Sequence, residues 1–360
     1  MSGGVDSSVA ACLLKKQGYR VSGVTMQIWQ GEAAFEEGKH HACYGPGEGE
    51  DIEDARKVCQ ILDIPFHIID LRQEYKTEVL DYYCNEYLSG RTPNPCFRCN
   101  STVKFGALLR KTRESARLSG HGGQGIEFDF FATGHYARVE YNKEKKRYLL
   151  KKAADLSKDQ SYFISSLSQE QLARALFPIG NFTKSEIRKM ATDFGLPVDN
   201  KPESQDFIAG GYQSLIGATP TGPITDRQGN VLGEHRGIPF YTIGQRKGLG
   251  ISSEEPQYVI EIDSESNTIV VGNREQLYNN ELIASGLNWI AIEKLERPIE
   301  VAARIRYRHK EAEATVTPMD ENKVFVKFNQ PQPAITPGQT VVFYQGDVVV
   351  GAGTIERSKE

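Results

Sequence analysis

The chain has 360 residues, 39% of them hydrophobic and 25% charged, which is enough for about two or three domains with substantial cores. No apolar run approaches the ~18 residues of a membrane span, and residues 1–30 lack the layout of a signal peptide, so we expect a cytoplasmic protein that does not enter a membrane. The formal charge of −4, from 43 basic and 47 acidic residues, does not by itself indicate a nucleic-acid-binding protein.

Helix and strand signals alternate through the first half of the chain. Good helix formers at 7–17 end at Gly18, and Asp51 is placed to cap a helix that runs to residue 62. Thr183 and Glu186 form a capping box for a helix that ends at Gly195. Further helices are predicted at 72–88 and 102–117, and strands at 20–26, 66–70 and 126–134. Strands that alternate with helices predict βαβ units and a parallel sheet.

From residue 202 onward the pattern changes to short strands between glycines and prolines. Residues 202–279 are predicted to form a small β-rich domain, and the short strands at 280–360 a β-barrel. The predicted architecture is therefore a Rossmann-like α/β domain with a parallel sheet at 1–201, a central β-rich domain and a C-terminal β-barrel.

The cysteines are unevenly distributed, since all six lie in the first 99 residues. A secreted disulfide scaffold would be shorter and would spread them, so the pattern indicates redox, metal or nucleophile chemistry in one domain. Cys12, Cys59 and Cys84 fall on predicted helix faces and are interpreted as core residues. Cys43, Cys96 and Cys99 remain as candidates for chemistry.

The first motif leads directly into the first predicted helix and consists of Ser2, Gly3, Gly4, Val5, Asp6, Ser7 and Ser8. Glycines let a backbone approach an anion, and serine hydroxyls with the N–H groups of a helix start form a phosphate cradle. The lysine and spacing of the Walker loop are absent. The motif resembles the pyrophosphatase-type loop (PP-loop) of enzymes that use ATP to adenylate a carbonyl oxygen and release pyrophosphate. This resemblance implies ATP on residues 2–8, with Asp6 near Mg²⁺ or near the loop backbone.

A loop of this type follows a strand in the middle of the sheet, whereas only Met1 precedes it in this sequence. We therefore expect the parallel sheet to lack a central strand.

The second motif is the CxxC formed by Cys96 and Cys99, which follows Asn94 and Pro95. Prolines at 93 and 95 favour an extended approach to a helix start, where unpaired N–H groups and the helix dipole lower the pKa of a thiol. We therefore expect a thiolate at neutral pH. Half a zinc site is the usual alternative, but the second CxxC is absent.

Basic residues are clustered although the total charge is nearly balanced. Residues 138–158 hold eight basic and three acidic side chains. A second cluster occupies every second position, which predicts one face of a strand: Arg304, Arg306, Arg308 and Lys310. One such cluster is often only a solvated surface, but two clusters in different domains favour a polyanion such as RNA.

Together the motifs resemble the bacterial tRNA-specific 2-thiouridylases, PP-loop sulfurtransferases that thiolate the wobble uridine of certain tRNAs. The resemblance covers essentially the whole length. Besides the loop and Met26, it rests on the segments Asn94 to Gly106, Ala132 to Tyr136, Ser157 to Tyr162, Glu203 to Asp206, Tyr241 to Leu249, and Arg306 with Tyr307.

The resemblance implies that ATP, with Mg²⁺, activates the C2 oxygen of uracil as an adenylate, and that sulfur carried by a cysteine displaces AMP. It places Met26 and Gly134 near the adenine or ribose and Cys99 at the position of the nucleophile. It places Asn94, Pro95 and Cys96 against the target base, and the tRNA against Lys158, Asp159, Gln160, Arg306 and Tyr307. The implied partners are tRNAs for Lys, Glu and Gln and a sulfur donor such as a cysteine desulfurase or a relay protein, and we expect a monomer.

The sequence departs from the family at two positions. Much of the family has an aspartate at position 96 and a second cysteine shortly after the Ser-Gln-Asp motif, but here Cys96 replaces the aspartate and no cysteine follows Asp206. Either Cys96 replaces the missing partner in a disulfide and persulfide relay, or Cys43, Cys96 and Cys99 hold a [4Fe–4S] cluster with one open iron.

Two other functions remain open at this point. One is another PP-loop enzyme that acts on a small molecule, which has no obvious need of a basic barrel. The other is a tRNA-binding relative that has lost catalysis, suggested by the missing strand.

Overall fold

The computed structural model describes residues 1–31, 42–118, 127–199, 201, 206–208, 215–320 and 322–356. The chain divides into two compact units, which are described separately. The first unit comprises Met1–Val79, Cys96–Ser214 and Asp347–Val349, and the second comprises Leu80–Pro95, Leu215–Gly346 and Val350–Glu360. Among the described helices, none is long and apolar enough to cross a membrane.

The first unit contains the predicted parallel strands, but they form separate pairs. Strand β1 (Gly23–Gln27) pairs in parallel with β3 (Phe66–Asp70), with Met26 beside Ile69. Two shorter parallel pairs are β2 (Ala42–Tyr44) with β8 (Asp206–Ile208) and β4 (Phe131–Ala132) with β7 (Ala175–Leu176). Within the described ranges, β1 and β4 belong to different strand pairs.

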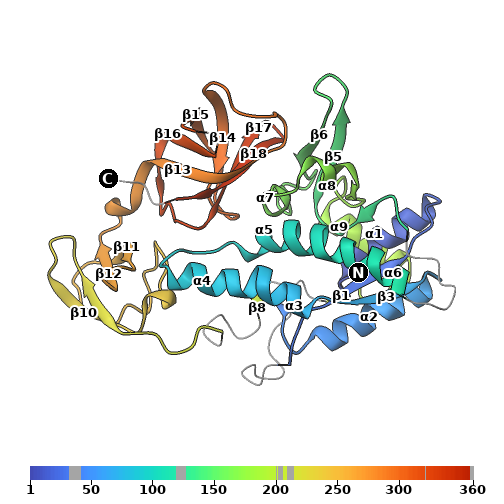
Figure 1. Cartoon of the computed structure of the whole chain (residues 1–360), viewed down its shortest axis with the longest axis horizontal. Helices are drawn as coiled ribbons and strands as arrows, with labels where there is room; N and C mark the ends of the chain where they lie inside the picture. The colour runs from blue at the N-terminus through green and yellow to red at the C-terminus, as the bar shows by residue number, and fades with distance from the viewer. Residues whose placement is uncertain are drawn as a thin grey trace. The chain divides into compact units, whose positions relative to one another are not determined.

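The helices of this unit follow the predicted order (Figure 1). They include α1 (Val5–Lys16), α2 (Glu48–Ile61), α7 (Ser161–Ile164), α8 (Gln169–Ala173) and α9 (Lys184–Asp193). Thr183 caps α9 in the predicted capping box with Glu186. The prediction that Asp51 caps α2 was wrong, because the helix begins one turn earlier and Gly47 is its N-cap.

Both long helical stretches contain a π-helical segment. The first consists of α3 (Arg72–Tyr75), the π-helix η1 (Lys76–Asp81) and α4 (Tyr82–Leu88), and the second of α5 (Pro95–Cys99), the π-helix η2 (Asn100–Ala107) and α6 (Leu108–Leu118). A π-helix brings residues five positions apart, rather than four, into successive turns. The sequence pattern predicted these helices without indicating the change of period.

The core of the first unit lies between α1 and α9. Val9 and Ala10 of α1 pack in one buried cluster with Ile187 and Ala191 of α9 and with Tyr136. The hairpin of β5 (Ala137–Asn142) and β6 (Arg147–Lys152) continues the chain from Tyr136, so the start of α1 and this hairpin share one packed region. The predicted strand at 126–134 is reduced to the two residues of β4.

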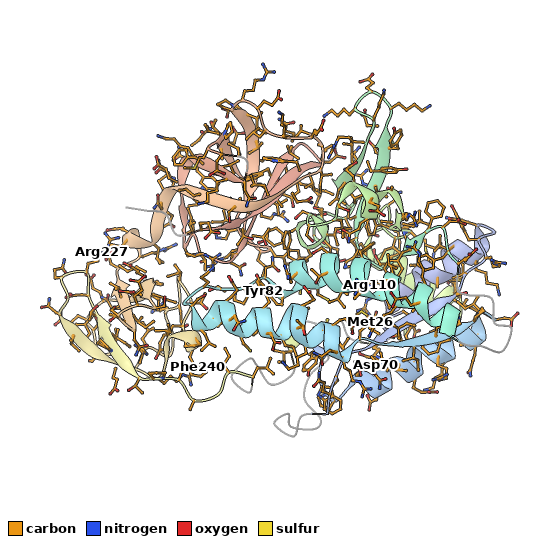
Figure 2. All side chains as sticks on the ribbon, viewed as in Figure 1. Met26, Asp70, Tyr82, Arg110, Arg227 and Phe240 are labelled. Atoms are coloured by element: carbon orange, nitrogen blue, oxygen red, sulfur yellow. The ribbon has the colours of Figure 1, made fainter. Side chains whose placement is uncertain are left out.

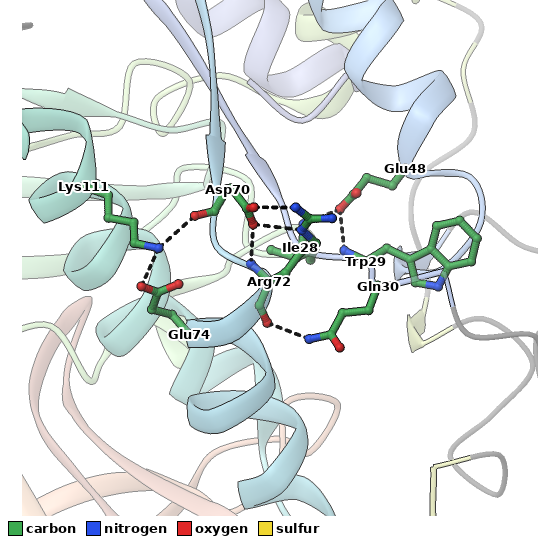
Figure 3. A network of polar contacts seen from close by, with 8 residues as sticks. All are labelled: Ile28, Trp29, Gln30, Glu48, Asp70, Arg72, Glu74 and Lys111. Atoms are coloured by element: carbon green, nitrogen blue, oxygen red, sulfur yellow. Dashed lines mark hydrogen bonds and ion pairs between the residues drawn. The ribbon is translucent and has the colours of Figure 1, made fainter. Parts of the chain in front are cut away.

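A polar network fixes the loops at the ends of β1 and β3 (Figure 3). The carboxylate of Glu48, at the start of α2, accepts hydrogen bonds from the backbone N–H groups of Ile28 (2.7 Å) and Trp29 (3.0 Å). The Arg72 guanidinium forms two hydrogen bonds with the Asp70 carboxylate, which lowers the pKa of Asp70 to about 2. The network holds the chain just after Met26 (labelled in Figure 2), on the strand implied to lie near the nucleotide.

The second unit contains a small sheet and a barrel. The small sheet has the order β10-β9-β12-β11, formed by β9 (Gly222–Thr225), β10 (Val231–His235), β11 (Tyr258–Asp263) and β12 (Thr268–Gly272), with short 3-10 helices η4 (Ile238–Phe240) and η5 (Glu275–Leu277). The barrel has the order β13-β16-β15-β14-β17-β18 and closes through pairing of β13 with β18.

The barrel strands are β13 (Tyr278–Trp289), β14 (Ile299–Arg304), β15 (Ala312–Pro318), β16 (Lys323–Pro333), β17 (Thr340–Gln345) and β18 (Val348–Ile355). Alternate residues such as Val301 and Ala303 fill the interior, as the strand period requires. The predicted fold class, a parallel α/β domain followed by a β-rich domain and a β-barrel, is confirmed.

Candidate active site

The start of α1 is arranged to receive an anion. Its N-cap is Gly4, which provides no side-chain cap, so the N–H groups of the first turn are not satisfied by a capping side chain. The hydroxyls of Ser7 and Ser8 both donate to the Gly4 carbonyl, at 3.1 and 2.8 Å, which tightens the turn. The Ser2 backbone N–H donates to the Ser7 hydroxyl at 3.2 Å. Helix α9, by contrast, satisfies its own first turn with a capping box.

Two glycines allow other segments to approach this loop closely. Gly3 has a φ of +66°, and a Cβ there would lie 2.3 Å from the backbone oxygen of Asp51 on α2. A Cβ on Gly134 would lie 2.6 Å from the backbone nitrogen of Ser7. Gly134 therefore packs directly against the start of α1.

Asp6, in the first turn of α1, is held by two side chains from later in the sequence. The Tyr136 hydroxyl donates to its Oδ1 at 2.9 Å, and the Lys184 ammonium lies 2.8 Å from Oδ1 and 2.9 Å from Oδ2. The expectation for Asp6 was Mg²⁺ or the loop backbone. In the structure its carboxylate is neutralised by Lys184, and neither Lys184 nor Tyr136 was assigned a role from the sequence.

The two thiols of the CxxC are covered. Cys99 is 6% exposed, and Cys96 is half-buried. Burial raises the pKa of Cys99 to about 11 and that of Cys96 to about 12, while the Lys104 ammonium acts in the opposite direction on both. The predicted thiolate at neutral pH is therefore wrong for this state, because the helix start does not offset the loss of solvation.

Lys104 lies five positions after Cys99, on the π-helix η2. In an α-helix these two residues would point in different directions, but the wider turn brings positions five apart together. Its charge is therefore placed to stabilise a Cys99 thiolate once one forms. Lys104 lies within the Asn94 to Gly106 segment, but this role was not predicted from the sequence.

Cys43 lies on β2 and is exposed, next to Tyr44, whose ring stacks on Tyr75 at 5.5 Å. All six cysteines are free thiols, and Cys12 and Cys59 are buried as expected while Cys84 is half-buried. In the described part of the chain, no three His, Cys, Asp or Glu side chains are arranged to hold a metal ion. The donor set of Cys43, Cys96 and Cys99 thus receives no support as a cluster site, and no step below uses one.

Hydrogen bonds join the segment Lys158 to Gln160 to Tyr136, the residue that holds Asp6. The Asp159 carboxylate is buried and accepts from the backbone N–H groups of Ala153 (3.0 Å) and Ser161 (3.2 Å). Gln160 exchanges hydrogen bonds with the backbone of Tyr136, at 2.8 and 2.9 Å. Gln160, one of the residues implied to contact tRNA, therefore also fixes the backbone of Tyr136, whose hydroxyl holds Asp6. Lys158 is half-buried.

The other implied contacts lie in the second unit. Asn94 is buried and donates from Nδ2 to the Thr340 hydroxyl at 3.0 Å, and Pro95 follows as the first residue of α5. The Arg306 guanidinium donates to the carbonyl oxygens of Ile243 (3.0 Å) and Ala334 (3.1 Å), and Tyr307 is half-buried.

The predicted basic strand face does not form. Strand β14 ends at Arg304, which pairs with Glu311 at 3.3 Å, and residues 305–309 are bends and turns. In the other basic cluster, Arg138 and Lys151 both contact the Asp347 carboxylate, at 2.9 and 3.4 Å. Part of the positive charge of the two basic clusters is therefore neutralised by carboxylates of the protein itself.

Glu203, Ser204 and Gln205, which belong to a family motif, lie outside the described residues.

A signal for Lys184 was present in the sequence. A lysine in the first turn of a helix faces the positive end of the helix dipole, which disfavours it there. Such a placement indicates a partner outside the helix, and Asp6 is that partner.

Three family models match the chain in succession. The one described as tRNA methyl transferase HUP domain matches residues 1–209, the tRNA methyl transferase PRC-barrel domain matches residues 212–273, and the aminomethyltransferase beta-barrel domain matches residues 279–355.

Curated relatives match over nearly the whole length. The chain is 50% identical over 365 residues to tRNA-specific 2-thiouridylase MnmA 2 of Thermoanaerobacter sp. (strain X514), covering 99% of this chain and 96% of the relative. It is 47% identical over 364 residues to tRNA-specific 2-thiouridylase MnmA of Moorella thermoacetica, covering 99% and 98%, and 45% identical over 366 residues to that of Desulforamulus reducens, covering 99% and 96%. The chain therefore belongs to the family of tRNA-specific 2-thiouridylases.

Proposed function

We propose that this protein is an ATP-dependent tRNA-uridine 2-sulfurtransferase that acts on the wobble uridine. The observation that carries the proposal is the start of α1, where an N-terminus without a side-chain cap follows two glycines and lies against Gly134. A helix start of this form binds phosphate groups. The CxxC of α5 belongs to the same compact unit, so a phosphate site and a thiol pair are available to one reaction.

The first step is adenylation of the uracil. The C2 oxygen attacks the α-phosphorus of ATP, pyrophosphate leaves, and the oxygen becomes part of a good leaving group. The N–H groups of the first turn of α1, with the hydroxyls of Ser7 and Ser8, would hold the phosphates. Met26 and Gly134 would contact the adenine or ribose. Mg²⁺, when bound, would neutralise phosphate charge, and Asp6 is the carboxylate next to the loop that is suited to hold it.

The second step is sulfur transfer from Cys99. A Cys99 persulfide attacks C2 with its terminal sulfur, and AMP leaves with the former uracil oxygen. The Cys96 thiolate then attacks the Cys99 sulfur, which releases the 2-thiouridine and leaves a disulfide between the two cysteines. An external dithiol reduces that disulfide, and a cysteine persulfide donor reloads Cys99. This relay needs no cysteine after Asp206.

The buried thiols explain why the relay waits for substrate. With pKa values raised to about 11 and 12 by burial, Cys99 and Cys96 are protonated at neutral pH. Lys104 lowers both values and would stabilise the thiolate that each step produces. Unwanted oxidation of the pair is therefore slow in the free protein.

The tRNA would be contacted by Lys158, Asp159 and Gln160 and by Arg306 and Tyr307. The family resemblance extends this to the tRNAs for Lys, Glu and Gln. Because Gln160 also fixes the backbone of Tyr136, whose hydroxyl holds Asp6, we propose that tRNA bound to this segment acts on the start of α1.

The proposal is tested by pyrophosphate exchange into ATP, measured with and without a tRNA that carries a wobble uridine. We expect exchange only with that tRNA, and 2-thiouridine when a persulfide donor is added. Exchange without tRNA would favour a small-molecule substrate, and tRNA binding without exchange would favour a binding protein without catalysis. Cys99→Ala should retain exchange and lose thiolation, whereas Cys84→Ala, on α4, should retain both.

A further inference from the structure

Lys184 provides a positive charge directly beside the proposed phosphate site. Its Nζ lies 2.8 and 2.9 Å from the two carboxylate oxygens of Asp6, and Asp6 lies in the first turn of α1. The Lys184 side chain is only 13% exposed, against 30% for Asp6. The ion pair is therefore largely shielded from solvent and next to the N–H groups of the loop.

This lysine does not stabilise the helix that carries it. It is the first residue of α9, where the helix dipole disfavours a cation. The capping box of Thr183 and Glu186 already satisfies N–H groups at this end. The ammonium instead pairs with Asp6, on a different helix.

The position of the ammonium is fixed by a buried aromatic residue. Tyr136 is 2% exposed, and its hydroxyl donates to Asp6 Oδ1 at 2.9 Å. Gln160 holds the Tyr136 backbone on both its N–H and its carbonyl side. Lys184 Nζ lies 5.7 Å from the centre of the Tyr136 ring, within the range of a cation–π contact. The Lys184 ammonium is therefore held in position before a ligand binds.

The loop itself contains no positive side chain. Residues 2–8 include neither lysine nor arginine, whereas the Walker loop uses its own lysine on the phosphates. Adenylation expels pyrophosphate, and the negative charge that develops on this leaving group requires a preorganised positive group.

We propose that Lys184 is a phosphate-binding residue of the ATP site, supplied from outside the loop. Its ammonium neutralises Asp6 in the free protein and contacts the phosphates of ATP when the nucleotide binds. This inference rests on the proposed function, because it assumes that the start of α1 binds ATP.

The test is calorimetric titration of Lys184→Met with ATP, with pyrophosphate and with adenosine, in buffer without divalent cations. Loss of a charged hydrogen bond to phosphate should weaken ATP and pyrophosphate binding about 10- to 100-fold. Adenosine binding should not change, and Lys184→Arg should retain most of the affinity. Lys327→Met is the control, since Lys327 is also paired with a carboxylate, Glu281 at 3.4 Å, but lies on β16 of the second unit.

The double variant Asp6→Asn with Lys184→Met separates binding from simple charge neutralisation. If Lys184 only neutralised Asp6, removing both charges would restore affinity for ATP and pyrophosphate. We expect the double variant to remain weak, and it also provides a folded protein should the unpaired Asp6 carboxylate destabilise the single variant. Restoration by Asp6→Asn, or wild-type affinity in Lys184→Met, would overturn the inference. Absence of ATP binding in the wild type would instead contradict the proposed function.

Discussion

Gly134→Ala tests the contact between the phosphate loop and the segment after β4. The added Cβ would lie 2.6 Å from the Ser7 nitrogen and 2.7 Å from the Asp6 carbonyl carbon. Ordinary contact begins at 3.4 Å, so the two segments must separate by roughly 0.8 Å. Both atoms belong to the backbone of α1, which leaves no side chain to rotate away.

The cost of such overpacking is about 1–3 kcal/mol. Relief of the clash displaces the first turn of α1. We therefore expect Gly134→Ala to lower both the affinity for the nucleotide and the free energy of unfolding. An ATP affinity about 5- to 150-fold weaker follows if the displacement acts mainly on the loop. Titration calorimetry with a non-hydrolysable ATP analogue measures the affinity, and urea unfolding measures the stability.

Gly217→Ala is the matched control, since a Cβ there meets no atom of the described residues within 4 Å and the residue has no positive φ. It should change neither quantity. If Gly134→Ala bound the analogue as tightly as the wild type and unfolded at the same urea concentration, Gly134 would not support the loop and the assigned site would be wrong.

Two further predictions concern protonation. Burial, with a smaller effect of Lys104, lowers the pKa of His135 to about 3, so between this value and the unfolded value near 6.5 the unfolded chain binds one proton more. Stability should therefore fall as the pH is lowered from 6.5 toward 3, with His135 contributing up to about 1.4 kcal/mol per pH unit. Urea unfolding of His135→Asn should show a smaller slope, and an unchanged slope would refute the buried neutral histidine. For the thiols, the rate of Cys99 alkylation by iodoacetamide, followed by peptide mass spectrometry, should rise about tenfold per pH unit from pH 7 to 9 without a plateau, since burial raises the pKa to about 11. Lys104→Met should slow it further, whereas a plateau near pH 7 would show an active-site thiolate that the structure does not account for.

The sequence predicted those parts of the fold that depend on local patterns. The helix at 7–17 corresponds to α1, the strand at 66–70 corresponds to β3, and the capping box at Thr183 opens α9. These features rest on the period of apolar residues and on capping chemistry, both of which can be read within a few positions.

Three failures, at Arg306, Cys99 and Lys184, involve contacts between residues distant in the sequence. The alternation from Arg304 to Lys310 predicts a strand face, but the Arg304–Glu311 pair and the hydrogen bonds of Arg306 to distant carbonyls accompany a turn. The thiolate prediction considered the dipole at a helix start and could not include the burial of Cys99. The partnership of Lys184 with Asp6 spans 178 positions, so only the unusual helix position of the lysine pointed to it.

The central claim is that the C2 oxygen of the wobble uridine is adenylated before sulfur replaces it. The direct measurement uses tRNA with ¹⁸O at C2 of that uridine and mass spectrometry of the released AMP. The mechanism predicts one ¹⁸O atom in the phosphate of each AMP formed, in equal amount to the 2-thiouridine. Thiolated tRNA accompanied by unlabelled AMP would contradict the mechanism.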